Sequence, residues 1–302
     1  SLTDYPVISP MNDFLIRLLP ALFGILTIPM IFLVARRILQ DDWAGIIAAF
    51  LFSISPFMIF YAQELRIYSF YVLISLLALY GMVRAIEEDR WYWWWMMVLM
   101  LTLLMYSHFI TVWTIFAFNL YYVCVIWLYR RHFWKWFSAN LILMALIAFP
   151  LYLAFRFDEI TSSIVHKWAP NPTAKTIFVT FKNYFAGYGP SAWAYWPLFL
   201  MALFFFMLGL VALWRGWTVG RRKHGWTSAL LLAILVSVPL AGCTIIWTLR
   251  HFSFYEHRLF IFSGVAAMMA VSAGMRALGR PRRTAAALAL FALFTLPNLA
   301  DF

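Results

Sequence analysis

Long stretches without a charged residue alternate along the whole chain with short clusters of polar and basic residues. Ten of these stretches contain 17 or more residues each. A helix needs roughly 20 apolar residues to cross the hydrocarbon core of a bilayer. The pattern therefore predicts ten membrane-spanning helices, at residues 18–35, 43–62, 67–83, 91–107, 109–129, 136–155, 193–214, 226–249, 259–275 and 284–300.

Two details of the pattern predict where the helices turn or bend. Residues 91–129 form one unbroken apolar stretch of 39 residues, about the length of two crossings. Its most polar point is Ser107-His108, so a helical hairpin is predicted there. A proline inside a span removes a backbone donor and predicts a bent helix. Examples are Pro29, Pro56, Pro150 and Pro239.

The residues outside the ten stretches are divided among nine connections and two ends, which leaves no room for a soluble domain. We therefore predict an all-α fold, a polytopic transmembrane helix bundle that forms a single domain over residues 1–302. Its longest connection is an external loop at residues 156–192. Within that loop, residues 177–185 have the pattern of an amphipathic segment that lies in the membrane interface.

Composition supports this class and excludes others. Hydrophobic residues make up 65% of the chain and charged residues only 12%, which excludes a soluble globular domain and a disordered chain. Both cysteines, Cys124 and Cys243, lie inside apolar stretches, so neither a disulfide framework nor a cysteine-based metal site is predicted. The net charge of +11 comes from clusters between apolar stretches and does not indicate nucleic-acid binding.

The distribution of Lys and Arg predicts how the bundle sits in the membrane. Alternate sides of the ten spans receive 15 and eight basic residues. The more basic side is cytoplasmic by the positive-inside rule, so both ends of the given chain face outward. We expect a multi-pass protein of the plasma membrane, meaning the bacterial inner membrane or its equivalent, in contact with membrane lipids.

Polar and ionisable residues gather on the predicted outer side. Ionisable groups near the hydrocarbon cost several kcal/mol unless they are paired or hydrated, so these groups predict a polar pocket near the outer face. They are Gln63-Glu64-Leu65-Arg66, His108, Asp158-Glu159, Arg250-His251 and Tyr255-Glu256-His257-Arg258.

Simpler interpretations exist for the same residues. Glu64 and Arg66 could form a local ion pair, and His108 could cap the hairpin by bonding a carbonyl. The spacing of His251, Glu256 and His257 resembles a metal cluster, but simple interfacial residues are the better interpretation. We predict no metal site, and no cofactor is indicated beyond a divalent cation, which stays open.

The segment 55–69 contains Ser-Pro, then a Tyr, then Gln-Glu-x-Arg-x-Tyr. It resembles the helix-end signature of GT-C class membrane glycosyltransferases of the dolichyl-phosphate-mannose protein mannosyltransferase-like group (glycosyltransferase family 39 type). Three further stretches are similar in order and spacing, and the resemblance covers about residues 14–280. They are Arg17 to Gly24, Tyr106-Ser107-His108-Phe109, and Arg258-Leu259, where Leu replaces the family's Tyr.

The resemblance implies an enzyme that moves a sugar from a polyprenyl-phosphate carrier to an acceptor at the outer face, with inversion at the anomeric carbon. Negative charge builds on the departing phosphate, so cations are needed to hold it. Arg66 and Arg258 are the candidates for this role, and Arg250 and Lys167 are weaker ones. The substrate-binding residues implied for lipid phosphate or sugar are Gln63, Glu64, Arg66, Tyr68, His108 and Arg258.

The catalytic residue is not assigned. In this family the catalytic Asp lies in a first outer loop, ahead of the stretch that resembles Arg17 to Gly24. Only Asp4 and Asp13 precede the first predicted span, and neither has the family's Asp-Glu context. Either the given chain begins after the catalytic loop, or this member does not catalyse.

Two other functions were weighed. The first is a non-catalytic, glycosyltransferase-like membrane subunit that packs lipids or pigments within a larger membrane complex. The absent catalytic loop favours it, and the aromatic stretch at residues 91–95 would suit protein or lipid contacts, although an ordinary interfacial belt is the simpler explanation of that stretch. The second is a secondary transporter, which would need charges inside the spans and an internal repeat, and the sequence shows neither clearly.

Overall fold

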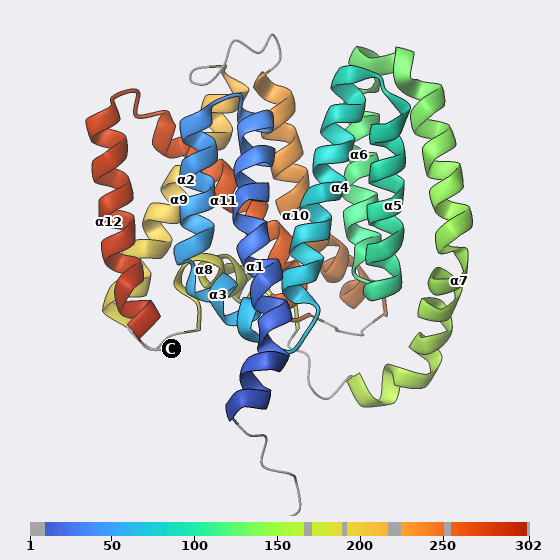
Figure 1. Cartoon of the computed structure of the whole chain (residues 1–302), viewed down its shortest axis with the longest axis horizontal. Coiled ribbons are helices and arrows are strands. Elements are labelled where there is room, and N and C mark those ends of the chain that lie inside the picture. The colour runs from blue at the N-terminus through green and yellow to red at the C-terminus, as the bar shows by residue number, and fades with distance from the viewer. Residues whose placement is uncertain (1–9, 166–170, 189–191, 217–224, 251–254, 301–302) are drawn as a thin grey trace, which may run out of the picture.

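The computed structural model describes residues 10–165, 171–188, 192–216, 225–250 and 255–300, and all regular structure in these ranges is helical (Figure 1). The predicted all-α class is confirmed. Every predicted span falls on a helix or on a pair of helices. The α-helices are α1 (Pro10–Leu39), α2 (Asp42–Ile54), α3 (Pro56–Gln63), α4 (Tyr68–Glu88), α5 (Trp91–Ser107), α6 (Thr111–Tyr129), α7 (Phe133–Val165), α8 (Ala174–Ala186), α9 (Ala192–Trp214), α10 (Gly225–Arg250), α11 (Ile261–Arg276) and α12 (Pro281–Ala300), with short 3-10 helices η1 (Arg130–His132) and η2 (His257–Phe260).

The number of membrane spans differs from the prediction. Six helices within the described ranges are long and apolar enough to cross a membrane, or up to seven if one bent pair counts as a span. The chain is therefore a multi-pass membrane protein by length and composition, but the predicted count of ten is not confirmed. One of the predicted spans, α5, has only 17 residues, which is at the lower limit for a crossing.

The predicted span at residues 43–62 is two helices. Helices α2 and α3 meet at an angle of 62°. Pro56 occupies the first turn of α3, and Ser55 before it is extended, with φ −68° and ψ 119°, because a residue that precedes proline is excluded from the helical region. The Ser55 hydroxyl accepts a hydrogen bond from the Met58 amide at 3.3 Å and so caps α3. The bend predicted from Pro56 is confirmed as a break.

The core of the bundle lies around α11. Every residue of α11 from Ile261 to Met275 is buried. Helix α9 approaches it so closely that a Cβ atom on Gly274 would lie 1.9 Å from the Phe205 carbonyl oxygen, and one on Gly209 would lie 2.0 Å from the Ala270 carbonyl oxygen. Small residues permit such backbone contact between helices in a membrane.

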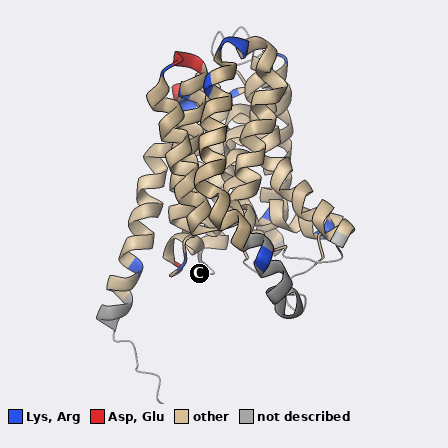
Figure 2. Cartoon of the chain, turned by 90° about the vertical axis from the view of Figure 1, so that its right-hand side faces the viewer, with Lys and Arg blue, Asp and Glu red and all other residues tan. Residues whose placement is uncertain are grey.

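The two ends of the bundle differ in charge. The end at which α1, α4 and α11 finish carries most of the described Lys, Arg, Asp and Glu (Figure 2), and we call it the basic end. At the other end α1 begins and α12 finishes (Figure 1), in agreement with the prediction that both chain ends face one side. We call it the opposite end.

The predicted external loop at residues 156–192 is largely helical. Helix α7 continues to Val165, because residues 156–165 contain no proline or glycine to stop it. The predicted amphipathic segment 177–185 lies within α8. Helix α8 packs against α9 and α3, so it covers the opposite end of the bundle.

Candidate functional site

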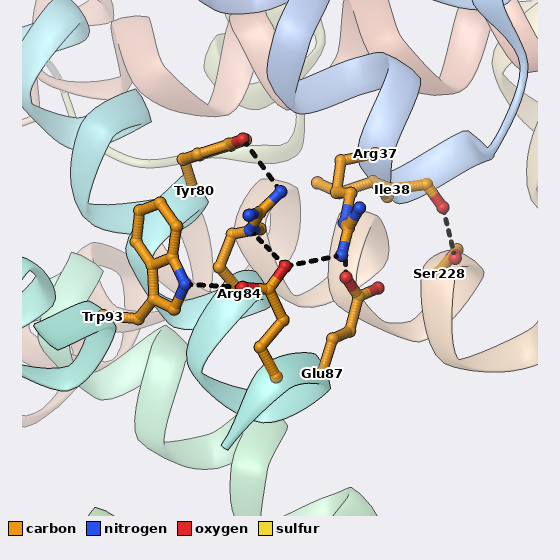
Figure 3. A network of polar contacts seen from close by, with 8 residues as sticks. Arg37, Ile38, Tyr80, Arg84, Glu87, Trp93 and Ser228 are labelled. Carbon is orange, nitrogen blue, oxygen red and sulfur yellow. Dashed lines mark hydrogen bonds and ion pairs between the residues drawn. The ribbon is translucent and has the colours of Figure 1, made fainter. Parts of the chain in front are cut away.

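At the basic end, several charged side chains from different helices pair with one another (Figure 3). Arg37 at the end of α1 donates to Glu87 at 2.5 Å and to Glu88 at 3.3 Å, both at the end of α4. Glu88 also accepts from the Trp93 indole at 2.9 Å and pairs with Arg84 at 2.7 Å. The carboxylates of this cluster are therefore satisfied inside the protein.

Two further partly buried groups of contacts lie at this end. Arg276 of α11 donates two hydrogen bonds to Asp41, at 2.9 and 3.1 Å, and this links α11 to the start of α2. Asp89 after α4 accepts from Lys135 at 2.8 Å and contacts the buried His132 ring at 2.7 Å. Burial opposes the ionisation of Asp89, but the hydrogen bonds from Lys135 and His132 outweigh it and lower the pKa of that carboxyl. These contacts tie helices together.

At the opposite end, the Gln-Glu-x-Arg-x-Tyr string forms the turn between α3 and α4. Gln63 is the last residue of α3, Glu64 follows in an extended conformation, and the Arg66 amide donates to the Glu64 carbonyl oxygen at 2.7 Å. Helix α4 then begins at Tyr68. The tight turn places the carboxylate and the guanidinium next to the start of a helix, where partial positive charge favours an anion.

Three of the six predicted residues line one small cavity. Tyr68 comes from α4, His108 from the hairpin between α5 and α6, and Arg258 from the start of η2. The Arg258 guanidinium carbon lies 5.9 Å from the centre of the Tyr68 ring, which is within the range of a cation–π contact. The fold thus brings together segments that lie far apart in the sequence.

His108 is neutral in this environment. Burial lowers its pKa below the ordinary 6.5, and the positive charge of Arg258 lowers it further. Its Nδ1 atom accepts a hydrogen bond from the Ile110 amide at 3.2 Å. The hairpin turn predicted at Ser107-His108 is confirmed, and His108 caps it by accepting from an amide rather than by bonding a carbonyl.

Glu64 and Arg66 lie beside this cavity without pairing to each other among the described contacts. The Oε2 atom of Glu64 is shielded from solvent and has no hydrogen-bond partner in the described part of the chain. Arg66 is exposed, and a hydrogen bond with the Tyr68 side chain raises its pKa. The charge of Glu64 acts on Arg66, Tyr61 and Tyr188. A buried carboxylate oxygen without a partner is costly, unless a ligand supplies the donor.

Arg258 has one acidic neighbour. It forms an ion pair with Glu256 in the same loop, with about a quarter of its side chain exposed. A pair this close to the surface leaves donors of the guanidinium available, because Arg carries five N–H groups. Guanidinium groups are suitable donors for an anion, and the unpartnered carboxylate oxygen of Glu64 is an acceptor for a hydroxyl group.

The remaining predicted residues are not part of this cluster. Gln63 is exposed at the end of α3 and takes no part in its described contacts. No group of three His, Cys, Asp or Glu side chains among the described residues could hold a metal ion. Asp4, Lys167 and His251 lie outside the described residues, and the structure describes only the backbone of Asp13, Asp158, Glu159 and Arg250.

The sequence did not indicate the contacts that α8 and the turn after it make with α3 and with the loop before η2. The Tyr61 and Tyr188 hydroxyls are 2.7 Å apart, and Tyr188 follows α8. Thr180 of α8 contacts Tyr255 and His257 through its hydroxyl. The amphipathic pattern of residues 177–185 could have signalled that one face of this helix packs on the protein.

One family model matches the chain. Residues 7–153, which include α1 to α6 and most of α7, match the family described as dolichyl-phosphate-mannose-protein mannosyltransferase. The match includes Glu64, Arg66, Tyr68 and His108, whereas Arg258 lies beyond it. No curated protein and no solved structure matches the chain. The resemblance seen in the motifs is confirmed: over residues 7–153 the chain is similar to the dolichyl-phosphate-mannose-protein mannosyltransferases, which are membrane glycosyltransferases of the GT-C type.

Proposed function

We propose that this protein transfers a sugar from a polyprenyl-phosphate carrier to an acceptor at the outer face of the plasma membrane. The observation that carries the proposal is the convergence of Tyr68, His108 and Arg258 on one cavity, with Glu64 and Arg66 beside it. The family match supports a GT-C-type glycosyltransferase. The carrier, the acceptor side and the membrane are our proposals.

The proposed roles follow from the chemistry of the leaving group. When the bond between sugar and phosphate breaks, negative charge develops on the lipid phosphate, and a guanidinium stabilises that charge with oriented hydrogen bonds. Arg258 and Arg66 would hold the phosphate. Glu64, with its unpartnered oxygen, would accept hydrogen bonds from sugar hydroxyls, and neutral His108, whose Nδ1 already accepts from the Ile110 amide, would donate one through Nε2. No residue is assigned as the catalytic base.

A transfer assay tests the proposal. Full-length protein in liposomes is given polyprenyl-phosphate sugar labelled in the sugar, together with a mixed pool of acceptors. Transfer of the label is expected, and Glu64→Ala or Arg66→Ala should abolish it. The matched control is Arg280→Ala, an exposed arginine just before α12, which should leave transfer unchanged. Unchanged rates in both site variants would overturn the assignment.

The non-catalytic subunit is the second candidate, because neither Asp4 nor Asp13 has the context of the family's catalytic residue. Binding of the lipid phosphate without any transfer would support a donor-binding subunit. Isolation at fixed stoichiometry with a partner complex, without bound lipid phosphate, would support a packing subunit.

A further inference from the structure

The loop that carries Arg258 is attached to α8 mainly through the Thr180 hydroxyl group, and the Tyr255 hydroxyl also donates to the Thr176 carbonyl oxygen at 3.3 Å. The Thr180 Oγ1 atom lies 2.5 Å from the Tyr255 hydroxyl and 2.7 Å from Nδ1 of His257. It also lies 2.9 Å from the Thr176 carbonyl oxygen, to which it can donate. Thr180 and Tyr255 are both fully buried. Water therefore does not compete for the bond between Thr180 and Tyr255, and its loss would leave buried polar atoms with fewer partners.

The backbone conformation of Glu256, which lies between Tyr255 and His257, determines which way the neighbouring side chains point. Glu256 is extended, with φ −138° and ψ 138°, so the side chains on either side of it, Tyr255 and His257, point to one face and Glu256 to the other. Tyr255 and His257 both reach Thr180. Glu256, on the other face, pairs with Arg258. The Arg258 guanidinium then lies against the Tyr68 ring, at the candidate cavity.

Helix α8 is itself attached to the other side of the candidate site. The Ser55 hydroxyl donates to the Tyr184 carbonyl oxygen of α8 at 2.8 Å, and Ser55 is the residue that caps α3. Helix α3 leads directly to Gln63 and Glu64. One short helix thus contacts both the segment that presents Glu64 and the loop that presents Arg258.

We propose that Thr180 is a positioning residue, which fixes Arg258 at the cavity by holding Tyr255 and His257. The proposal rests on the proposed function, in which Arg258 holds a lipid phosphate. Thr180 does not line the cavity and would not touch the ligand. Its effect on ligand binding would therefore pass through Arg258.

Binding of a short prenyl phosphate tests the proposal. The full chain in lipid nanodiscs is titrated with farnesyl phosphate. Thr180→Val, which keeps the shape and removes the hydroxyl, should weaken binding about tenfold, because the hydrogen bonds to Tyr255 and His257 are lost. Thr180→Ser should restore most of the affinity. The matched control is Thr295→Val, a buried threonine of α12 whose hydroxyl bonds only within its own helix, to the Phe291 carbonyl oxygen at 2.8 Å.

A double-mutant cycle separates this role from a general loss of structure. In the background of Arg258→Ala, Thr180→Val should cause no further loss of affinity, since its effect is transmitted by Arg258. An undiminished further loss in that background would overturn the proposal. So would equal affinities of Thr180→Val and the wild type.

Hydrogen exchange gives a readout that needs no ligand. Amides in residues 255–260, including that of Leu259, which bonds the Glu256 carbonyl oxygen at 3.0 Å, should exchange faster in Thr180→Val but not in Thr180→Ser or Thr295→Val. Unchanged exchange in Thr180→Val would overturn the anchoring of the loop. Wild-type protein that does not bind farnesyl phosphate, with faster exchange in Thr180→Val, would instead overturn the proposed function and leave the anchoring in place.

Discussion

The two ends of the bundle both carry charged side chains, but they use them differently. At the basic end the described carboxylates have partners within the protein, as in the pairs of Arg37 with Glu87 and Arg276 with Asp41. At the opposite end an oxygen of Glu64 is buried without a partner, and Arg66 makes no ion pair among the described contacts. Charge density alone therefore does not distinguish the two ends, whereas the buried carboxylate oxygen of Glu64, which has no partner among the described residues, does.

The physical reason lies in the cost of holding charges near hydrocarbon. A closed network offsets that cost because every charged group has a hydrogen-bond partner inside the protein, and such a network stabilises the fold. A site that binds a charged lipid head group must leave donors and acceptors available, so it contributes less to stability. Substitutions at the two ends should therefore separate stability from activity.

The largest contrast is expected between two arginines of similar exposure, Arg258 with 27% and Arg276 with 25% of the side chain accessible. Arg258→Ala should lower sugar transfer about 100-fold, because a donor to the developing phosphate charge is lost. Arg276→Ala should leave transfer per folded molecule unchanged and lower the thermal midpoint of unfolding. Equal losses of transfer in the two variants would remove the distinction between the ends.

Substitution at the contact between α9 and α11, next to the basic end, should have the next largest effect, and this effect should be on stability alone. Gly274→Ala places a methyl group against the Phe205 carbonyl and should lower the free energy of unfolding by about 3 kcal/mol, because the backbones of α9 and α11 must separate. The free energy of unfolding is measured in mixed detergent micelles. Ala285→Val, on an exposed face of α12, is the control. Wild-type stability of Gly274→Ala would show that α9 and α11 are not in backbone contact.

A smaller effect is expected from the ion pairs themselves. Asp41→Asn removes the charge that pairs with Arg276 but retains the cap of α2, in which Asp41 accepts from the Ala44 amide at 2.7 Å. Because this pair is largely buried, the variant should lose about 1 to 2 kcal/mol of unfolding free energy.

The neighbouring Asp42 supplies the control for that experiment. Its pair with Arg36 is exposed on both sides, so Asp42→Asn should change the unfolding free energy by less than about 0.5 kcal/mol. If Asp41→Asn and Asp42→Asn lose the same free energy of unfolding, burial does not determine how much an ion pair stabilises the protein at this end.

The smallest effect is a dependence of stability on pH at the opposite end. The pKa of His108 is lowered in the folded protein from its ordinary 6.5, first by burial and then by Arg258. The unfolded chain therefore takes up this proton more readily, and the stability that neutral His108 provides is lost as pH falls below about 6.5. Unfolding midpoints at pH 7.5 and 5.5 measure the loss. His108→Gln should show a smaller difference between the two pH values, and an equal difference would contradict the shift.

Much of the architecture could be predicted from the sequence, because hydrophobic pattern and proline act locally. The helical runs, the break at Pro56 and the turn at Ser107-His108 follow from composition and local backbone preference. The helical course of α7 to Val165 was missed, since polar residues were read as a loop although none of them stops a helix. The ten-span count was not confirmed, because an apolar run alone does not determine whether a helix crosses the membrane as a separate span.

The candidate site was predictable only in part. The turn with Glu64 and Arg66 has a local signature, and His108 and Arg258 stood out as ionisable groups beside apolar runs. Thr180 and Tyr188 gave no such signal, because their role arises from contacts with residues far away in the sequence, such as the bond from Thr180 to His257. Periodicity does not encode contacts of that range.

The most direct test asks which end of the bundle binds the lipid phosphate. A polyprenyl phosphate with a photoreactive group next to the phosphate is cross-linked to the full-length protein in liposomes, and the labelled peptides are identified by mass spectrometry. We expect label in residues 64–68, 108–110 and 255–258, reduced in Arg258→Ala and retained in Arg276→Ala. Label confined to residues 84–93 or 276–283 at the basic end would contradict the account.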